Sequence, residues 1–369
     1  MILDVNSPLA NGYLDRTAPW TTYTNAYYQQ VFGVIEAFKS FDNVLGFFAG
    51  NEVINEDAAR LAPLYVRAVI RDMKDYIAKQ CDRAIPVGYS AADVRDILMD
   101  TVHYFECDLK NSTSSRADFF GLNSYSWCGD ASYKSSGYDV LTEDFSNATL
   151  PVFFSEYGCN EVKPRIFTEV QALYGDEMTQ AFSGGLVYEF TQEDNEYGLV
   201  QVNDNGTITT LIDYDNLMKQ FGKLDMKRIS ASNSTQTSIN PESCSSSLIN
   251  NSTFYDAWNL PDAPSKVSDY IKNGLPNKPT GSLVSVTATT LSQKVYDYTG
   301  KEITGIKFNV LANDESNTPS SSSGTSGTSS STSASGTSTH SNAASVLNGG
   351  PSIALGGLSG LFMLLASLL

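Results

Sequence analysis

Apolar residues between residue 1 and about residue 225 follow two alternating patterns. Short apolar runs bounded by Gly and polar residues are typical of strands buried on both faces of a parallel sheet. Between most of these runs, apolar residues recur at helical spacing. The expected strands lie at 2–5, 44–53, 85–90, 117–125, 152–156 and 185–190, and the expected helices at 23–39, 63–80, 167–174 and 213–221. The pattern predicts repeated βα units and an α/β fold with a parallel sheet.

The pattern contains six strands, whereas a (β/α)8 TIM barrel needs eight. An open α/β sheet and a barrel without its first two βα units both fit this number. We favour the barrel, because residue 1 lies directly against a strand that no element covers or borders. The expected catalytic domain is therefore residues 1–227, which carry strands 3 to 8 of a TIM barrel.

Two glutamates occupy matching positions at the ends of predicted strands. Glu52 closes the apolar run 44–53, and Glu156 closes the run 152–156. Catalytic groups of (β/α)8 barrels project from the C-terminal ends of the strands. In retaining glycoside hydrolysis, one carboxylic acid protonates the leaving oxygen while a second carboxylate, about 5 Å away, attacks the anomeric carbon. The pair therefore indicates a glycosidase-type site, although a single strand-end glutamate is more often a solvated loop residue.

Other polar and aromatic residues near these strand ends suit a carbohydrate site. Asn51 precedes Glu52 and is placed to bond a sugar 2-hydroxyl. Tyr125 and Tyr188 either hold the oxygens of the nucleophile, stack on sugar rings or pack in the core. Trp127 offers a further flat apolar face. Asp4 also lies at a strand end, where it binds substrate or only caps a loop.

Charge and histidine content exclude several classes of function. The formal net charge is -17 and the pI is about 4.4, so no basic surface is available to bind nucleic acid. The two histidines are His103, which we expect to be structural, and His340, which lies in a Ser-rich segment. This content argues against a histidine metal site and a Ser-His-Asp triad. We expect neither a metal nor a cofactor.

The composition changes after about residue 228. We expect a post-barrel extension over 228–317, with a small hairpin around residues 297–300. Residues 318–345 are almost entirely Ser, Thr, Gly, Ala and Asn and predict a disordered, O-glycosylated stalk. Residues 346–369 form an apolar end that resembles a GPI-attachment signal, with Ser341 and Asn342 as candidate attachment residues. A tail-anchored transmembrane helix is the alternative, but the run is short for one and lacks flanking cations.

The cysteines and glycosylation sequons fit an oxidising, extracellular compartment. A disulfide between Cys128 and Cys159 would join two loops at the ends of neighbouring strands, and one between Cys107 and Cys244 would attach the extension to the barrel. Cys81 is then left without a partner. The candidate N-glycosylation sites are Asn111, Asn147, Asn205, Asn233, Asn250 and Asn251.

Five segments together carry a family resemblance. They are residues 42–53, 85–90, 121–129, 153–159 and 184–189. From residue 1 to about 225, the chain resembles the fungal β-1,3-glucanosyltransferases of glycoside hydrolase family 72. The resemblance implies a (β/α)8 barrel of the retaining glycosidase type. It also implies cleavage of an internal β-1,3-glucan bond and transfer of the new reducing end to the non-reducing end of another glucan.

The resemblance also assigns roles to individual residues. Glu52 matches the acid/base and Glu156 matches the nucleophile. The active-site positions of the family are matched by Asn51, Tyr125 and Tyr188, its substrate-contacting aspartate by Asp4, and its disulfides by Cys128 with Cys159 and Cys107 with Cys244. The expected partners are donor and acceptor β-1,3-glucan and, through a GPI lipid, the outer face of the plasma membrane at the cell wall.

Two features depart from the family pattern. Family members begin well before this chain does, which agrees with the expected loss of two βα units. Residues 250–315 contain no cysteine, so the chain resembles the subgroup without the Cys-rich carbohydrate-binding module. The remaining alternatives are an endo-β-1,3-glucanase, which uses the same glutamates, and a non-catalytic glucan-binding wall protein or inactive fragment.

Overall fold

The computed structural model describes residues 1–231, 240–279, 284 and 287–307. Several sequence predictions lie outside these residues: the stalk at 318–345, the GPI signal at 346–369, the candidate attachment residues Ser341 and Asn342, and the sequon at Asn233. In the described part of the chain, no helix combines the length and apolar character that a membrane span requires.

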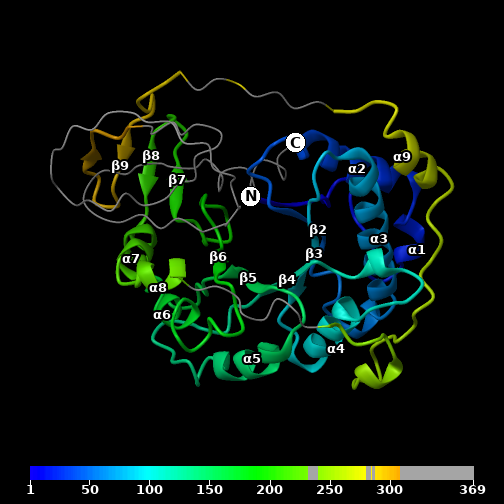
Figure 1. Cartoon of the computed structure of the whole chain (residues 1–369). Coiled ribbons are helices and arrows are strands. Elements are labelled where there is room, and N and C mark those ends of the chain that lie inside the picture. The colour runs from blue at the N-terminus through cyan, green and yellow to red at the C-terminus, as the bar shows by residue number, and fades with distance from the viewer. Residues whose placement is uncertain (232–239, 280–283, 285–286, 308–369) are drawn as a thin grey trace, which may run out of the picture.

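Six parallel strands form the central sheet, and their order in space is their order in the chain. They are β1 (Ile2–Asp4), β2 (Gly46–Asn51), β3 (Val87–Ala92), β4 (Phe119–Asn123), β5 (Val152–Tyr157) and β6 (Gly185–Val187). The sheet is curled, and the helices lie on its outer side (Figure 1). This is the arrangement of six consecutive units of a (β/α)8 barrel, so the predicted fold class is confirmed. The two further units expected upstream concern residues outside this sequence and stay a prediction.

The helices alternate with the strands, as the hydrophobic spacing predicts. They are α1 (Pro19–Thr22), α2 (Asn25–Phe38), α3 (Ala62–Gln80), α4 (Arg95–Glu106), α5 (Tyr138–Asp144), α6 (Glu169–Leu173), α7 (Ile212–Phe221), α8 (Met226–Ala231) and α9 (Val267–Asn273). Short 3-10 helices occur at Asp57–Ala59, Thr113–Ser115, Phe145–Asn147 and Ser246–Leu248. In α2, Val31, Phe32 and Ile35 are fully buried, and the Thr24 side chain caps the helix by accepting from the backbone N–H of Tyr27. Such buried faces place the core between the sheet and the helices.

The sequence pattern did not predict α4 or α5. In α4, the buried apolar residues Ile97, Leu98, Val102 and Phe105 are interspersed with the buried polar residues Asp100 and Thr101. The polar residues weaken the periodic signal, although each has a hydrogen-bond partner: Thr101 donates to the Ile97 carbonyl, and Asp100 accepts from the backbone N–H groups of Asn250 and Asn251. Tertiary contacts therefore stabilise a helix that hydrophobic spacing alone does not reveal.

A second, four-stranded sheet joins the barrel to the extension. Its strands are β7 (Val200–Val202), β8 (Ile208–Thr210), β9 (Val295–Tyr296) and β10 (Glu302–Ile303). β9 and β10 are an antiparallel pair around residues 297–300, where we expected a hairpin, and β9 pairs in parallel with β8. Strands β9 and β10 of the extension therefore belong to the same sheet as β7 and β8, which follow β6 in the chain (Figure 1).

The extension also packs on the outer side of α3. Arg71 Nη1 donates to the Pro261 carbonyl at 3.1 Å, and Gln80 Nε2 donates to the Ile271 carbonyl at 2.8 Å. The Cys107–Cys244 disulfide forms another link between barrel and extension. His103 Nδ1 lies 3.1 Å from the carbonyl oxygen of Leu248 in the extension, a contact that fits a structural histidine.

Both predicted disulfides are present, Cys107–Cys244 and Cys128–Cys159. Cys81 is half-buried and free. Among the described residues, the group with suitable spacing for a metal ion is Cys128, Cys159 and Glu161, and its two sulfurs are bonded to each other. This group therefore does not offer a thiolate metal site.

Candidate active site

The two glutamates lie at the same edge of the curled sheet. Asn51 is the last residue of β2, and Glu52 follows it in the left-handed backbone region, with φ of 51°. Glu156 lies near the end of β5, and the parallel register pairs it with Asn123 of β4. Positive φ is uncommon for a residue other than Gly. Here this conformation occurs where the strand turns away and the carboxylate of Glu52 faces the strand ends.

Asn123 connects the predicted acid/base to three strands. Its side chain is buried, and Nδ2 donates to Glu52 Oε1 at 2.9 Å and to Asn51 Oδ1 at 3.1 Å. Its Oδ1 accepts from Ser90 Oγ of β3 at 3.1 Å and from Ser155 Oγ of β5 at 2.7 Å. The two serine hydroxyls also lie 2.8 Å apart. The amide is therefore fixed on both sides and holds Glu52 in a single orientation.

Glu156 has one direct hydrogen bond from a predicted site residue. Tyr125 OH donates to Glu156 Oε2 at 2.6 Å. Burial raises the pKa of Glu156, and the negative charges of Glu52 and Glu189 raise it further, while hydrogen bonds from Tyr125 and Asn123 act in the opposite direction. The charge of Glu52 acts on Glu156 because both residues lie at the C-terminal edge of the sheet, next to Asn123.

Three tyrosine rings pack edge to face beside Glu156, and we call Tyr125, Tyr188 and Tyr197 the tyrosine cluster. The ring centroids of Tyr125 lie 6.2 Å from Tyr188 and 5.5 Å from Tyr197, and those of Tyr188 and Tyr197 lie 5.3 Å apart. Burial raises the pKa of Tyr188 to about 12. All three rings are partly exposed, so they are available to a ligand as well as to each other.

The prediction that Trp127 offers a face to sugars was wrong. Its side chain is 6% exposed, its Nε1 donates to Thr168 Oγ1 at 2.9 Å, and its ring packs against Tyr138 at 5.1 Å. Alternate residues of a strand point to the same side, so Trp127 would point in the direction of Tyr125 only if β4 continued through both residues. β4 ends at Asn123, before either of them.

Asp4 lies in a cavity of about 360 Å³ that extends from Glu52 and Asn51 to the loop after β1. Residues 13–16 of that loop form its other side. Asp4 Oδ1 accepts from the backbone N–H and the side-chain amide of Asn6, both at 2.8 Å. Burial raises the pKa of Asp4 to about 6. The cavity therefore begins at one glutamate and leads along the β1 side of the sheet.

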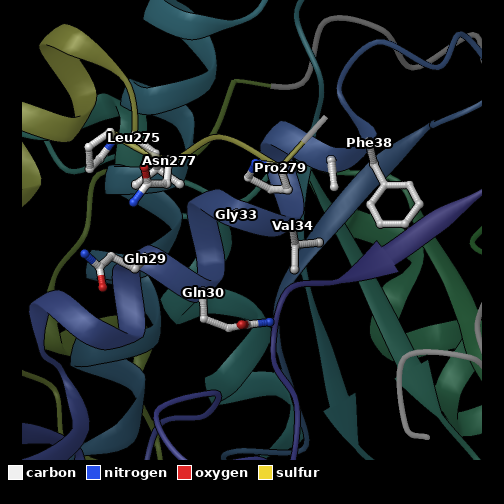
Figure 2. A pocket seen from close by; sticks show the side chains of 10 residues that line it. Gln29, Gln30, Gly33, Val34, Phe38, Leu275, Asn277 and Pro279 are labelled. Atoms are coloured by element: carbon white, nitrogen blue, oxygen red, sulfur yellow. The ribbon is translucent and has the colours of Figure 1, made fainter. Parts of the chain in front are cut away.

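A larger cavity, of about 490 Å³, lies elsewhere, between α2 and residues 275–279 (Figure 2). Gln29, Gln30, Val34 and Phe38 line it from the helix, and Asn277 faces them from the extension. No carboxylate lines this cavity among the described residues. It offers amide and apolar groups but no acid or base, so we assign the chemistry to the strand ends.

Among the sequons within the described residues, Asn111, Asn147, Asn205 and Asn250 are exposed. Asn251 is half-buried, and its Nδ2 donates to the Asp96 carbonyl at 3.2 Å. Glycosylation at these positions stays a prediction.

Sequence reasoning missed the polar network behind the glutamates and the third tyrosine. Asn123 ends a strand in the same way as Asn51, and this signal identifies it once the strand boundary is known. Ser90 is a polar residue within an otherwise apolar strand, and Ser155 directly precedes Glu156 in β5, which are weaker signals. Tyr197 lies in a loop after β6 and has no periodic pattern to mark it.

Comparisons with known proteins agree with the geometry. The family model for glucanosyltransferases, glycoside hydrolase family 72, matches residues 1–225. The 1,3-beta-glucanosyltransferase gel2 of Aspergillus fumigatus is 67% identical over 323 residues, which are 88% of this chain and 68% of gel2. The 1,3-beta-glucanosyltransferase PGA4 of Candida albicans is 43% identical over 76% of this chain and 60% of its own.

The chain is also similar to solved structures of Saccharomyces cerevisiae Gas2p. A Saccharomyces cerevisiae Gas2p mutant in complex with laminaritetraose and laminaripentaose superposes with a TM-score of 0.63 and 39% identity, over 72% of this chain and 56% of that chain. The apo form of the mutant gives a TM-score of 0.62 at 38% identity. The chain thus spans about two thirds of gel2 and a little over half of the solved Gas2p chains.

Proposed function

Because the chain belongs to the glucanosyltransferases of glycoside hydrolase family 72, we propose that it remodels β-1,3-glucan of the fungal cell wall. The reaction is retaining cleavage of an internal β-1,3-glucosidic bond, followed by transfer of the new reducing end to the non-reducing end of a second glucan. The observation that carries the proposal is the placement of Glu52 and Glu156 at one sheet edge, with Asn123 next to both.

In the first half of the reaction, Glu156 is the nucleophile that attacks the anomeric carbon, and Glu52 protonates the departing glycosidic oxygen. The product is a covalent glycosyl-enzyme on Glu156. The hydrogen bond from Tyr125 favours the ionised form of Glu156, which a nucleophile needs, and orients its free lone pairs. Asn123 holds Glu52 in place by donating to its Oε1 at 2.9 Å.

In the second half, Glu52 acts as a base. It removes the proton of an acceptor 3-hydroxyl, the acceptor oxygen attacks the anomeric carbon, and Glu156 leaves as a carboxylate. Water competes for the same intermediate, so the acceptor has to be bound and positioned close to it. The tyrosine cluster supplies partly exposed aromatic faces, and the cavity at Asp4 and Asn51 supplies polar groups for glucan hydroxyls.

We extend the proposal to location. A GPI lipid attached at Ser341 or Asn342 would hold the domain at the outer face of the plasma membrane, with the part of residues 318–345 that precedes the attachment residue as the stalk. The names of the fungal relatives support an extracellular or cell-wall location, and the two disulfides support an oxidising compartment.

Product analysis with a reduced β-1,3-gluco-oligosaccharide tests the proposal. The expected result is products longer than the substrate, which are absent with Glu156→Gln. Glu156→Gln removes the nucleophile and keeps the size and shape of the side chain, so circular dichroism should stay unchanged. Only shorter products would indicate an endo-β-1,3-glucanase instead, and no products at all would indicate a glucan-binding or inactive chain. Activity that survives in Glu156→Gln would contradict the nucleophile assignment.

A further inference from the structure

Arg165 is a buried arginine in the segment between β5 and α6, and its side chain is 1% exposed. Its Nε donates to Asp213 Oδ2 at 2.6 Å, and its backbone N–H donates to Asp213 Oδ1 at 3.1 Å. Asp213 lies in the first turn of α7, and Asn216 of the same helix donates to the Arg165 carbonyl at 2.8 Å. The guanidinium is therefore fixed from one side by a charge-assisted hydrogen bond to a helix.

The terminal nitrogens of Arg165 donate hydrogen bonds to carbonyl oxygens of three segments. Nη1 donates to the Tyr188 carbonyl at 2.7 Å and to the Gly158 carbonyl at 3.3 Å. Nη2 donates to the Tyr197 carbonyl and, at 3.4 Å, to the Gly198 carbonyl. One side chain thus connects the residues after Glu156, the end of β6 and the loop that follows it.

Two of these carbonyls belong to the tyrosine cluster. Arg165 donates hydrogen bonds to the main-chain carbonyls of Tyr188 and Tyr197. The rings of these two tyrosines pack edge to face against the ring of Tyr125. Tyr125 in turn donates to Glu156. None of the hydrogen bonds that Arg165 makes within the described residues goes to Glu52 or Glu156. Its hydrogen bonds therefore reach the reacting groups through other residues, namely the two tyrosines and Gly158, which follows Glu156 by two positions.

We propose that Arg165 is a positioning residue for glucan transfer, which fixes the tyrosine cluster against Glu156 so that Tyr125 keeps its hydrogen bond to the nucleophile. The inference rests on the proposed function, because it takes Glu156 as the nucleophile. A lysine cannot replace Arg165 in this role. The planar guanidinium reaches Asp213 and the carbonyls of three segments at once, whereas an ammonium group has three donors at a single point.

Arg67 provides a matched control. It is fully buried, it donates to Ser115 Oγ at 3.0 Å and to the Cys107 carbonyl at 2.8 Å, and it lies over the rings of Tyr104 and Trp258. It therefore resembles Arg165 in burial, in carbonyl partners and in ring contacts, since Arg165 lies over the rings of Phe167 and Tyr197. Unlike Arg165, it lies on α3, and none of its contacts within the described residues is with a site residue. Arg165→Lys and Arg67→Lys both replace a buried arginine, and only Arg165→Lys also changes an ion pair within the described residues, the one with Asp213.

The test compares both variants with the parent chain by thermal unfolding and by kcat/KM against pH on a β-1,3-gluco-oligosaccharide. Both should lose stability. Below the melting temperature, kcat/KM of Arg165→Lys should fall by about 10-fold to 100-fold, because small displacements of reacting groups reduce the rate by such factors. The kcat/KM of Arg67→Lys should fall by less than about twofold. The acid limb of the profile should move to higher pH in Arg165→Lys only. Loss of the hydrogen bond from Tyr125 to Glu156 favours the protonated form of Glu156, and the negative charges of Glu52 and Glu189, which also raise its pKa, remain in the variant.

Two further measurements test the role of Arg165 independently of the Arg165→Lys kinetics. If Arg165→Lys does not fold, Asp213→Asn removes the negative charge that pairs with Arg165 Nε and should shift the acid limb in the same direction. An NMR titration of the Glu156 carboxyl carbon needs no turnover and should give a higher pKa in the variant than in the parent chain. A parent chain without any product would contradict the proposed function, whereas an unchanged Glu156 titration, or kinetics equal to those of Arg67→Lys, would overturn the role of Arg165.

Discussion

Asn123 and Glu52 come from different strands, yet the side-chain amide of Asn123 donates to Glu52 Oε1 at 2.9 Å. The same amide accepts from Ser90 and Ser155 with its oxygen. The oxygen is occupied by two hydroxyls, so the amide cannot turn without leaving buried groups unpaired. The position of Glu52 is therefore fixed by a neighbour on β4 as well as by its own strand.

We expect Asn123→Ala to reduce kcat/KM by about 10-fold to 100-fold, because Glu52 loses its donor and the hydroxyls of buried Ser90 and half-buried Ser155 lose their acceptor. Steady-state kinetics on a β-1,3-gluco-oligosaccharide measures this loss. The control is Asn203→Ala, in which an asparagine in the turn between β7 and β8 loses two side-chain hydrogen bonds, to Thr207 and Thr209 at 3.0 Å each. Equal activity of the two variants would contradict a role of Asn123 at the site.

Tyr125→Phe tests the hydrogen bond to Glu156 in isolation. The bond lowers the pKa of Glu156 against the effects of burial and of the carboxylates of Glu52 and Glu189, so its removal raises that pKa. Because the nucleophile reacts when ionised, we expect the acid limb of kcat/KM to move to higher pH and the maximum to fall about tenfold. Tyr214→Phe, on α7, is the control, and its profile should match that of the parent chain. A Tyr125→Phe profile with an unmoved acid limb would show that this hydrogen bond does not govern Glu156.

Hydrophobic spacing predicted the six strands of the central sheet and four of the helices to within about three residues, because most of these elements bury apolar side chains at regular spacing. It did not predict β7 or β8. Strand ends then placed Glu52, Glu156 and Asp4 at one edge of the sheet, since parallel strands all end at the same edge. Trp127 failed the same reasoning because β4 stops at Asn123, and strand ends are the part of a pattern that propensity defines least well.

The residues that sequence reasoning did not find act through contacts between distant segments. Arg165 and Tyr197 lie in loops without periodicity, and they meet only because β5 and β6 are neighbours in the sheet. The hairpin at β9 and β10 was expected, but its pairing with β8 was not, since no local pattern relates residue 208 to residue 295. Such contacts are a property of the folded chain, and a single sequence does not encode them as a readable signal.

Glu169 allows a prediction about stability that does not depend on catalysis. It is 3% exposed, and burial raises its pKa from an ordinary value of 4.5 to about 7. The folded protein therefore holds this proton at pH values where the unfolded chain has lost it, so the free energy of unfolding falls as the pH rises from about 4.5 to about 7 and stays lower above that.

Glu169→Gln removes this dependence. We expect the variant to be more stable than the parent chain at pH 8, by up to about 3 kcal/mol, and the difference to disappear near pH 4.5. Chemical denaturation at the two pH values measures it. The exposed Glu143→Gln on α5 serves as control and should change little at either pH. A difference for Glu169→Gln that is equal at both pH values would mean that the carboxyl is already ionised in the folded protein.

The disulfide Cys128–Cys159 connects the two loops that follow Tyr125 and Glu156, each cysteine coming three residues after its active-site neighbour. It closes a segment with a sequence separation of 31, and a crosslink of this length stabilises a folded chain by about 3 to 4 kcal/mol in the chain-entropy model. We expect the double variant Cys128→Ser with Cys159→Ser to lose stability of this order. Activity should fall as well, because the loops that carry the nucleophile and its tyrosine are no longer tied to each other.

The second disulfide separates these two effects. Cys107–Cys244 has a sequence separation of 137 and ties the extension to the barrel away from the glutamates. The double variant Cys107→Ser with Cys244→Ser should therefore lose stability without losing kcat/KM below its melting temperature. Thermal unfolding and kinetics on the same samples distinguish the cases. If both double variants lost activity only in proportion to stability, the disulfide near Glu156 would have a purely structural role, and the position of the tyrosine cluster would depend on Arg165 and ring packing alone.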